Sequence, residues 1–271
     1  MKPPAPIALT IAGSDPGGGA GIQADLKTFH RFGVYGTAVV TLITVQNTTR
    51  VSRVETLDAG LVAEQLDAVL EDLPPRAVKT GALGTAAIMD AIAARRFGCP
   101  LVVDPVILST HGLALNDPAA SDSLGRLVRQ ATLVTPNLSE AAHLAGIEVV
   151  SVQQMREAAR RIADFGVPAI LVKGGHLADY TGDDAIDVLW CNGRFTEFTS
   201  PRIATRHTHG TGCTYSAAIT ALLARGFGME ESVARARRFI EEAIRTNPGL
   251  GRGSGPLNHW AGGDDIDSDS L

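Results

Sequence analysis

The chain has 271 residues, of which 45% are hydrophobic and 20% are charged, and its formal net charge is −5. This length and apolar content predict a large buried core, whereas the acidic balance argues against nucleic acid as a partner, and no apolar run reaches the roughly 20 residues that a membrane span needs. The three cysteines lack the spacing of a disulfide framework or a zinc site, which favours a reducing, cytoplasmic setting.

The first part of the chain alternates apolar strands with amphipathic helices. An apolar run at 7–13 predicts a buried strand, and the glycine-rich segment 17–33 predicts a turn followed by a helix. The β-branched run 37–47 predicts a second strand. Apolar residues at helical spacing within 61–73 predict a helix that Pro74-Pro75 ends.

The same alternation continues in the second part of the chain. An amphipathic helix is predicted over 153–166, and short buried strands are predicted at 76–81, 100–106, 131–137 and 168–176. Strands that alternate with helices predict βαβ units, so we expect a mostly parallel central sheet with helices on both faces, a three-layer α/β/α fold.

The last third of the chain departs from this pattern. Two alternating runs around Asn192-Gly193 within 185–198 predict an antiparallel hairpin, because Asn-Gly tolerates the positive φ angles of a type I′ turn. Two helices are expected at about 213–226 and 230–246. No linker divides residues 1–262, which we expect to form one domain, whereas the acidic tail 263–271 is expected to be disordered.

Polar and glycine residues follow most of the predicted strands. Ligands of a parallel sheet bind beyond the carboxyl ends of its strands, so these residues are candidates for a binding site. The candidates are Gly13 and the glycines at 17–21, Gln46, Asp104, Asn137, Lys173, and the run Gly210-Thr211-Gly212-Cys213.

The first glycine cluster, at 17–21, matches neither common phosphate motif. It is not a P-loop, since no Lys-Ser/Thr pair follows the last glycine, and Ile22 stands where a dinucleotide fingerprint needs its last glycine. A tight strand-to-helix turn explains the cluster, and so does a close approach of the backbone to a small ligand, with Asp25 one turn into the helix.

The second cluster precedes an apolar helix. The amide groups of residues 210–213 would point out of the helix N-terminus and form a cradle for anionic oxygen, as a phosphoryl group in transfer requires. A helix N-terminus also lowers the pKa of a thiol, so Cys213 could act as a base toward a substrate hydroxyl or bond to it. The alternative is a cysteine that packs as a small hydrophobic residue.

Other polar residues have structural and functional explanations. Lys173 ends an apolar strand, where a phosphate could pair its charge, or where its ammonium could reach water. Asn137 and Glu140 have the spacing of a capping box, and on spacing alone that reading is preferred over ligands of a hydrated Mg²⁺. The histidines show no metal-ligand spacing, and His207 and His209 are expected to be ordinary loop residues.

Five segments together resemble one enzyme family. They are ALTIAGSDPGGGAGIQADLKTFHRFGVYGTAVVTLITVQNT, VVDPV, LVTPNLSEA, LVKGGH and THGTGCT, in this order. In order and spacing they are similar to the hydroxymethylpyrimidine/phosphomethylpyrimidine kinases of thiamine biosynthesis, in the ribokinase-like superfamily. The resemblance implies an eight-stranded, mostly parallel sheet with a small β-hairpin lid. It also implies ATP and Mg²⁺ as cofactors, an aminopyrimidine substrate phosphorylated twice, and a homodimer.

The resemblance also implies roles for single residues. It places Gly13, Asp25, Gln46, Ala82 and Val106 at the pyrimidine. It places Lys173, Thr208, Gly210 and Gly212 at ATP, and Asp104, Asn137 and Glu140 near the metal through waters. In the wider superfamily an aspartate stands where this chain has Cys213, so the resemblance makes Cys213, with Gly210, Thr211 and Gly212, the catalytic turn.

Alternative functions remain open at this point. Ala82 replaces a methionine that many relatives carry, which implies a roomier pocket and keeps a pyridoxal or pyridoxine kinase as the nearest alternative. A non-catalytic pyrimidine- or nucleotide-binding module is an alternative of another class. A nicotinamide-dependent oxidoreductase lacks its fingerprint in this chain.

Overall fold

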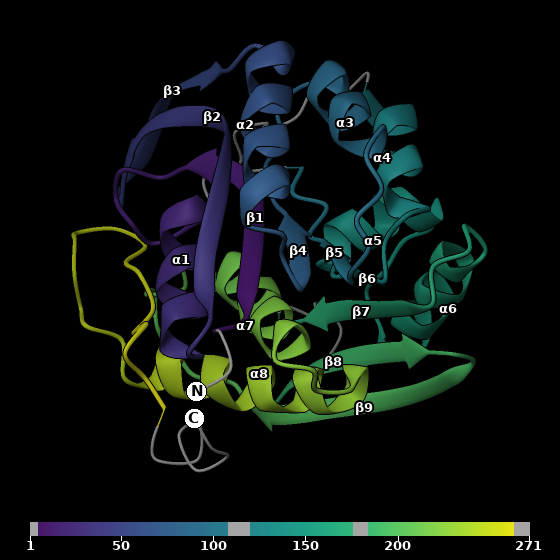
Figure 1. The fold of residues 1–271 in the computed structure, drawn as a ribbon. Coiled ribbons are helices and arrows are strands. Elements are labelled where there is room, and N and C mark those ends of the chain that lie inside the picture. The colour runs from purple at the N-terminus through teal and green to yellow at the C-terminus, as the bar shows by residue number, and fades with distance from the viewer. Residues whose placement is uncertain (1–4, 108–119, 176–183, 263–271) are drawn as a thin grey trace.

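A nine-stranded mixed sheet organises the computed structural model, which describes residues 5–107, 120–175 and 184–262. The strand order is β3-β2-β1-β4-β5-β6-β7-β8-β9 (Figure 1). The pairs from β2 through β7 are parallel, and the pairs β2·β3, β7·β8 and β8·β9 are antiparallel. The strands are β1 Ile7–Ser14, β2 Tyr35–Asn47, β3 Arg50–Thr56, β4 Ala77–Thr80, β5 Leu101–Val103, β6 Leu133–Val134, β7 Ala169–Gly174, β8 Asp184–Cys191 and β9 Arg194–Pro201.

Helices cover both faces of the sheet, as expected. One hydrophobic core joins the sheet to α2–α6, and a second core joins the opposite face to α1, α7 and α8 (Figure 1). The helices are α1 Gly21–Arg31, α2 Ala59–Asp72, α3 Ala86–Ala93, α4 Ser121–Val128, α5 Leu138–Ala145, α6 Val152–Ala163, α7 Thr211–Ala224 and α8 Met229–Arg245. The three-layer α/β/α fold is therefore confirmed, and α7 begins at Thr211, directly after the predicted anion cradle.

Two hairpins extend the parallel part of the sheet. The hairpin predicted around Asn192-Gly193 is confirmed as β8–β9, and both turn residues have the positive φ angles that the turn needs, 47° and 85°. The implied count of eight strands is wrong, because residues 50–56 add β3 beside the end of β2. The sequence missed β3 since its residues are exposed or half-buried, which leaves little apolar alternation. The acidic tail 263–271 lies outside the described residues.

The carboxyl ends of the parallel strands meet at one edge of the sheet. The chain leaves β1 to form β2 on one side and later returns to form β4 on the other side. Such a reversal separates the loops that follow neighbouring strands and opens a crevice between them. The loops after β1, β4, β5, β6 and β7 all reach this crevice, together with the first turn of α7.

A buried histidine beneath the first turn of α7 couples stability to pH. The imidazole Nε2 of His259 lies 3.1 Å from Thr214 Oγ1, and burial lowers the pKa of His259 to about 4. The unfolded chain has the ordinary histidine pKa of about 6.5, so between these values it binds more protons than the folded chain. We therefore expect the free energy of unfolding to fall by up to about 3 kcal/mol as the pH drops through this window.

The variant His259→Gln should lose this contribution to the pH dependence. Urea unfolding at pH 7.5 and pH 4.5 gives the two free energies to compare for each protein. His30→Gln, which replaces an exposed histidine, is the matched control and should keep the dependence of the unchanged chain. An undiminished pH dependence in His259→Gln would show that other groups cause it.

Candidate active site

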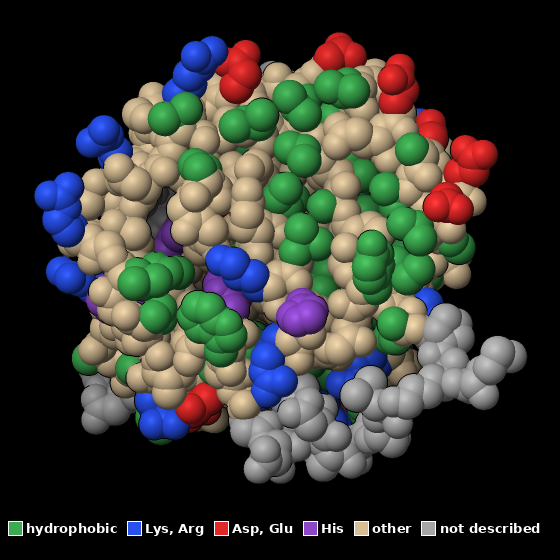
Figure 2. Space-filling view, turned by 60° about the vertical axis from the view of Figure 1, so that its left-hand side comes forward, with side chains coloured by type: hydrophobic (Ala, Val, Ile, Leu, Met, Phe, Trp, Pro, Cys, Tyr) green, Lys and Arg blue, Asp and Glu red, His purple; other side chains and the backbone are tan. Residues whose placement is uncertain are grey.

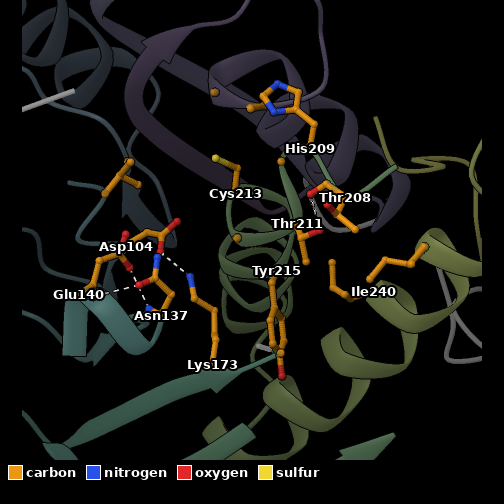
Figure 3. Close-up of a pocket in the computed structure, with 18 of the residues that line it drawn as sticks. Asp104, Asn137, Glu140, Lys173, Thr208, His209, Thr211, Cys213, Tyr215 and Ile240 are labelled. Carbon is orange, nitrogen blue, oxygen red and sulfur yellow. Dashed lines mark hydrogen bonds and ion pairs between the residues drawn. The ribbon is translucent and has the colours of Figure 1, made fainter. Parts of the chain in front are cut away.

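A cavity of about 860 Å³ lies at the carboxyl ends of the parallel strands. All but one of the site residues expected from the sequence line it: Gly13, Gln46, Ala82, Asp104, Val106, Asn137, Glu140, Lys173, Thr208, Gly210, Thr211, Gly212 and Cys213. Figure 3 shows Asp104, Asn137, Glu140 and Lys173 together on one side of the cavity and Cys213 at the end of α7. The structure therefore brings together residues that are up to two hundred positions apart in the chain.

The turn before α7 needs glycine at position 210. Gly210 has a φ of 80°, and a Cβ atom there would lie 1.8 Å from the carbonyl oxygen of Gly19. The two glycine-rich loops thus pack against each other through their backbones. No side chain fits at Gly210, whereas a Cβ atom on Gly19 would meet the side chains of His209 and Pro256.

The anion cradle is narrower than the sequence predicted. The amide of Thr211 donates to the carbonyl oxygen of Thr208 at 3.2 Å, and so does its hydroxyl at 2.7 Å, so the expected donor at Thr211 is engaged within the turn. In the described part of the chain, no acceptor is found for the amides of Gly212 and Cys213. These two groups at the N-terminus of α7 are the ones available to an anionic ligand.

Cys213 lines the cavity, yet its thiol is less acidic than the sequence predicted. Burial raises the pKa of Cys213 to about 11, although the charge of Lys79 and a hydrogen bond from the amide of Gly21 act in the opposite direction. The expectation that the helix N-terminus makes this thiol acidic is therefore wrong. Cys213 nevertheless lines the cavity, so its thiol is placed to meet a ligand there (Figure 3).

Lys173 and Asp104 form a partly buried ion pair beside the N-terminus of α7. Lys173 Nζ lies 2.9 Å from Asp104 Oδ1, which also accepts a hydrogen bond from Thr135. Burial alone would raise the pKa of Asp104, but Lys173 and Lys79 hold it below its ordinary value. A Cβ atom on Gly212 would lie 3.1 Å from Lys173 Nζ, so the ammonium group sits close to the first turn of α7.

Asn137 and Glu140 form the capping box that their spacing predicts. The Glu140 amide donates to Asn137 Oδ1 at 2.9 Å, and the Asn137 amide donates to Glu140 Oε2 at 2.8 Å. Burial raises the pKa of Glu140 to about 7. Among residues 5–107, 120–175 and 184–262, no group of three His, Cys, Asp or Glu side chains is placed to hold a metal ion.

The first glycine loop is closed around an aspartate. The carboxylate of Asp15 accepts the amides of Gly17, Gly19 and Ala20 at 2.7–3.1 Å, and it lies 2.9 Å from His209 Nε2. Burial alone would raise the pKa of Asp15, but bonds from the side chains of His209 and Gln46 hold it at about 2. The loop's amides therefore point at its own anion, which supports the tight-turn explanation of this cluster.

Asp25 is the site residue that the structure contradicts. Its side chain is fully buried and does not line the cavity. Its two carboxylate oxygens accept from Lys79 Nζ at 2.7 Å and from Thr10 Oγ1 at 2.6 Å. A direct contact between Asp25 and a substrate is therefore wrong, and Lys79, which does line the cavity, was missed. A lysine inside the apolar run 76–81 was the available signal, as it was for Lys173.

A second buried ion pair lies at the other end of the cavity and was also missed. Arg237 of α8 bonds to Asp187 of β8, to the hydroxyl of Ser200 and to the carbonyl oxygen of Ala185. Asp187 also accepts the amide of Gly174, directly after Lys173. This pair anchors the β8–β9 hairpin to α8, and the inward Asp in an alternating apolar strand was the signal that could have indicated it.

Known proteins are similar to this chain over nearly its whole length. A family model described as phosphomethylpyrimidine kinase matches residues 15–258. A thiamine biosynthesis bifunctional protein of Geobacter sulfurreducens is 47% identical over 265 residues, which are 95% of this chain and 53% of that protein, so this chain spans about half of its length. A hydroxymethylpyrimidine/phosphomethylpyrimidine kinase of Staphylococcus aureus is 45% identical, with 94% of both chains covered.

A solved structure shares the whole fold. The ADP complex of Bacillus subtilis pyridoxal kinase superposes with a TM-score of 0.86 at 36% identity, and the match covers 95% of this chain and 98% of that chain. The identity to this pyridoxal kinase is lower than the identity to the pyrimidine kinases.

Proposed function

The chain belongs to the phosphomethylpyrimidine kinase family, and from this premise we propose that it is the ATP-dependent kinase of 4-amino-5-hydroxymethyl-2-methylpyrimidine in thiamine diphosphate biosynthesis. It phosphorylates this pyrimidine to the monophosphate and then to the diphosphate. The observation that carries the proposal is the thiol of Cys213 in a cavity with Lys173 and the open amides of α7. A phosphotransferase needs a group that accepts the proton of the substrate hydroxyl, a cation near the phosphates and a cradle of donors for the transferred phosphoryl group.

The pyrimidine is proposed to lie against Gly13, Gln46, Ala82 and Val106. The amide nitrogen of Gln46 is held by Asp15, which leaves its carbonyl oxygen to accept from the exocyclic amine of the ring. A Cβ atom at Gly13 would lie 2.5 Å from the side chain of Leu42, so glycine is needed at this position of the cavity wall for packing against β2. The hydroxymethyl group would then face Cys213.

The nucleotide is proposed to lie on the other side of Cys213. The amides of Gly212 and Cys213 would bind the oxygens of the transferred phosphoryl group, and Lys173 would neutralise part of its charge. Gly210 and Thr208 shape the turn that aims these amides. Thr211 contributes its hydrogen bonds to that turn and no free donor.

Mg²⁺ is proposed to enter with ATP. Asp104, Asn137 and Glu140 offer only oxygen ligands, and several of these oxygens are already bonded within the chain, which suits contacts to the metal through water. Bound there, the ion would neutralise charge on the phosphates.

The test is a product assay with Mg·ATP. The purified chain is incubated with the hydroxymethylpyrimidine, with its monophosphate, or with pyridoxal, and the products are resolved by mass. A diphosphate from the pyrimidine is expected. Phosphorylation of pyridoxal alone would replace the proposal with the pyridoxal kinase function, and no phosphorylation of any substrate would favour a binding module. Ala82 on the cavity wall makes pyridoxal the comparison of choice.

Residues 1–262 are proposed to act as one cytoplasmic domain; in the part of the chain that the structure describes, no helix is long and apolar enough to cross a membrane. The protein is also proposed to be a homodimer. Many hydrophobic side chains reach the surface on the face in Figure 2. Independently of that view, Ile43 and Val45 of β2 and Leu61 of α2 are large and exposed. Light scattering that gives a monomer mass would contradict the dimer.

A further inference from the structure

A fully buried ion pair lies below the catalytic turn. Lys79 Nζ and Asp25 Oδ1 are 2.7 Å apart, and both side chains are 0% exposed. Lys79 lies on β4 in the middle of the sheet and pairs in register with Thr10 of β1, whose hydroxyl bonds to the same carboxylate. Burying two charges has a large desolvation cost, and an apolar pair of the same size would avoid it. Stability alone is therefore a weak reason for this pair.

The ammonium group of the pair points at Cys213. Lys79 Nζ lies 3.4 Å from the carbonyl oxygen of Cys213, and Lys79 lines the cavity although its side chain is inaccessible to bulk water. Positive charge at this place lies beside the N-terminus of α7, whose own partial charge is also positive. A positive charge this close to Cys213 favours the thiolate form of its side chain over the neutral thiol.

We propose that Lys79, held in place by Asp25, is a positioning residue that stabilises the thiolate form of Cys213 from below. The proposal deepens the proposed function, on which its catalytic meaning rests. In the first phosphorylation the O–H bond of the substrate breaks and its proton forms the S–H bond of Cys213. The same oxygen bonds to the γ-phosphorus of ATP while the bond from that phosphorus to the oxygen of ADP breaks.

The charged groups around Cys213 have opposing effects. Burial keeps the pKa of this thiol high, the charge of Lys79 lowers it, and the charges of Asp25 and Asp104 raise it. Lys173 also interacts with the thiol, and the amide of Gly21 donates to its sulfur. Of these groups, Lys79 lowers the pKa of Cys213 most. Asp25, the partner of Lys79, raises the same pKa by a smaller amount.

The test uses the reaction of Cys213 with iodoacetamide, because only the thiolate reacts. Cys99→Ser and Cys191→Ser remove the other thiols, so the rate reports Cys213 alone. Lys79→Met should raise the pH at which a given rate is reached by about one unit, which makes alkylation at pH 8 about tenfold slower. Asp25→Asn should move the profile in the opposite direction, because Lys79 then acts without its counterion.

Shifts of the alkylation profile in opposite directions in the two single variants distinguish an effect of charge from a loss of local structure. A general loosening of the turn would move both variants in the same direction, and that result, or no shift in either, would overturn the proposal. Lys79→Met/Asp25→Asn, which buries no lone charge, should still show slower alkylation, and it carries the test if the single variants do not fold. Arg95→Met/Asp67→Asn, which removes an exposed ion pair, is the control and should leave the profile unchanged.

Failure of this proposal is separable from failure of the proposed function. The alkylation profile needs neither ATP nor a pyrimidine, so it reports on Lys79 whatever the chain phosphorylates. Conversely, a chain that makes the diphosphate while both variants keep the original alkylation profile would be a kinase in which Lys79 has no influence on the thiol.

Discussion

Replacing Cys213 with alanine is expected to lower kcat for the first phosphorylation by about three orders of magnitude, since a positioned general base contributes about 10²–10⁴. The second phosphorylation should slow less, because its phosphate oxygen has no proton to remove. The KM for ATP should stay within about twofold, because the groups proposed to hold the phosphates do not depend on the thiol. They are the backbone amides of residues 212 and 213 and the side chain of Lys173. Steady-state kinetics with each pyrimidine substrate, in which the ATP concentration is varied, measures both kcat and the KM for ATP.

The other two cysteines provide matched controls. Cys99 and Cys191 do not line the cavity, so neither thiol is placed to reach the substrate hydroxyl. Cys99→Ala and Cys191→Ala should therefore keep the kcat of the unchanged chain. An unchanged kcat in Cys213→Ala would remove the thiol from the mechanism and leave a hydrogen-bonding role at most.

The parts of the site that the sequence predicted correctly rest on local signals. A glycine pair before an apolar helix indicates a turn with open amides, and the structure has Gly210 at φ 80° with α7 starting at the next residue. The spacing of Asn137 and Glu140 predicts a capping box because both partners lie on one turn. The alternation of strands and helices is also a pattern of neighbouring segments, and it predicted the three layers of the fold.

The parts that it missed depend on partners far apart in the chain. Asp25 and Lys79 are separated by 54 positions, and only the pairing of β1 with β4 brings them together. From the sequence, a carboxylate one turn into a helix looks accessible. The structure shows that β4 supplies its counterion and that α7 covers both, so Asp25 acts on the site through Lys79.

For Cys213, an argument from the neighbouring sequence alone predicts a pKa shift in the wrong direction. A helix N-terminus lowers the pKa of a thiol in an open position, and the sequence predicts such a helix correctly. Burial of the thiol beside Asp25 and Asp104 has the opposite effect and is larger. Only the tertiary structure contains these neighbours, so the sign of the shift could not be predicted from the sequence.

The high pKa of Cys213 leads to a prediction for Cys213→Asp. A thiol with a pKa of about 11 is mostly neutral at pH 8, so it can face a phosphate oxygen without repulsion, while its small thiolate fraction acts as the base of the first phosphorylation. A carboxylate can accept the hydroxymethyl proton in the first phosphorylation, but in the second it would face the phosphate of the monophosphate. Such like-charge contacts cost several kcal/mol. We therefore expect the first rate to stay within about tenfold and the second to fall by more than about 100-fold.

The variant Cys213→Ser separates the effect of a new negative charge from the effect of losing the thiol. Serine is neutral and of similar size but is a much weaker base, so it should slow the first phosphorylation more than the second, whereas the aspartate should slow the second one selectively. The ratio of the two rates, measured by mass for each variant, is the deciding quantity. If Cys213→Asp slows both steps equally, neutrality of the side chain is not the reason that a cysteine stands at this turn, and the cysteine would have to be explained by its size or polarizability.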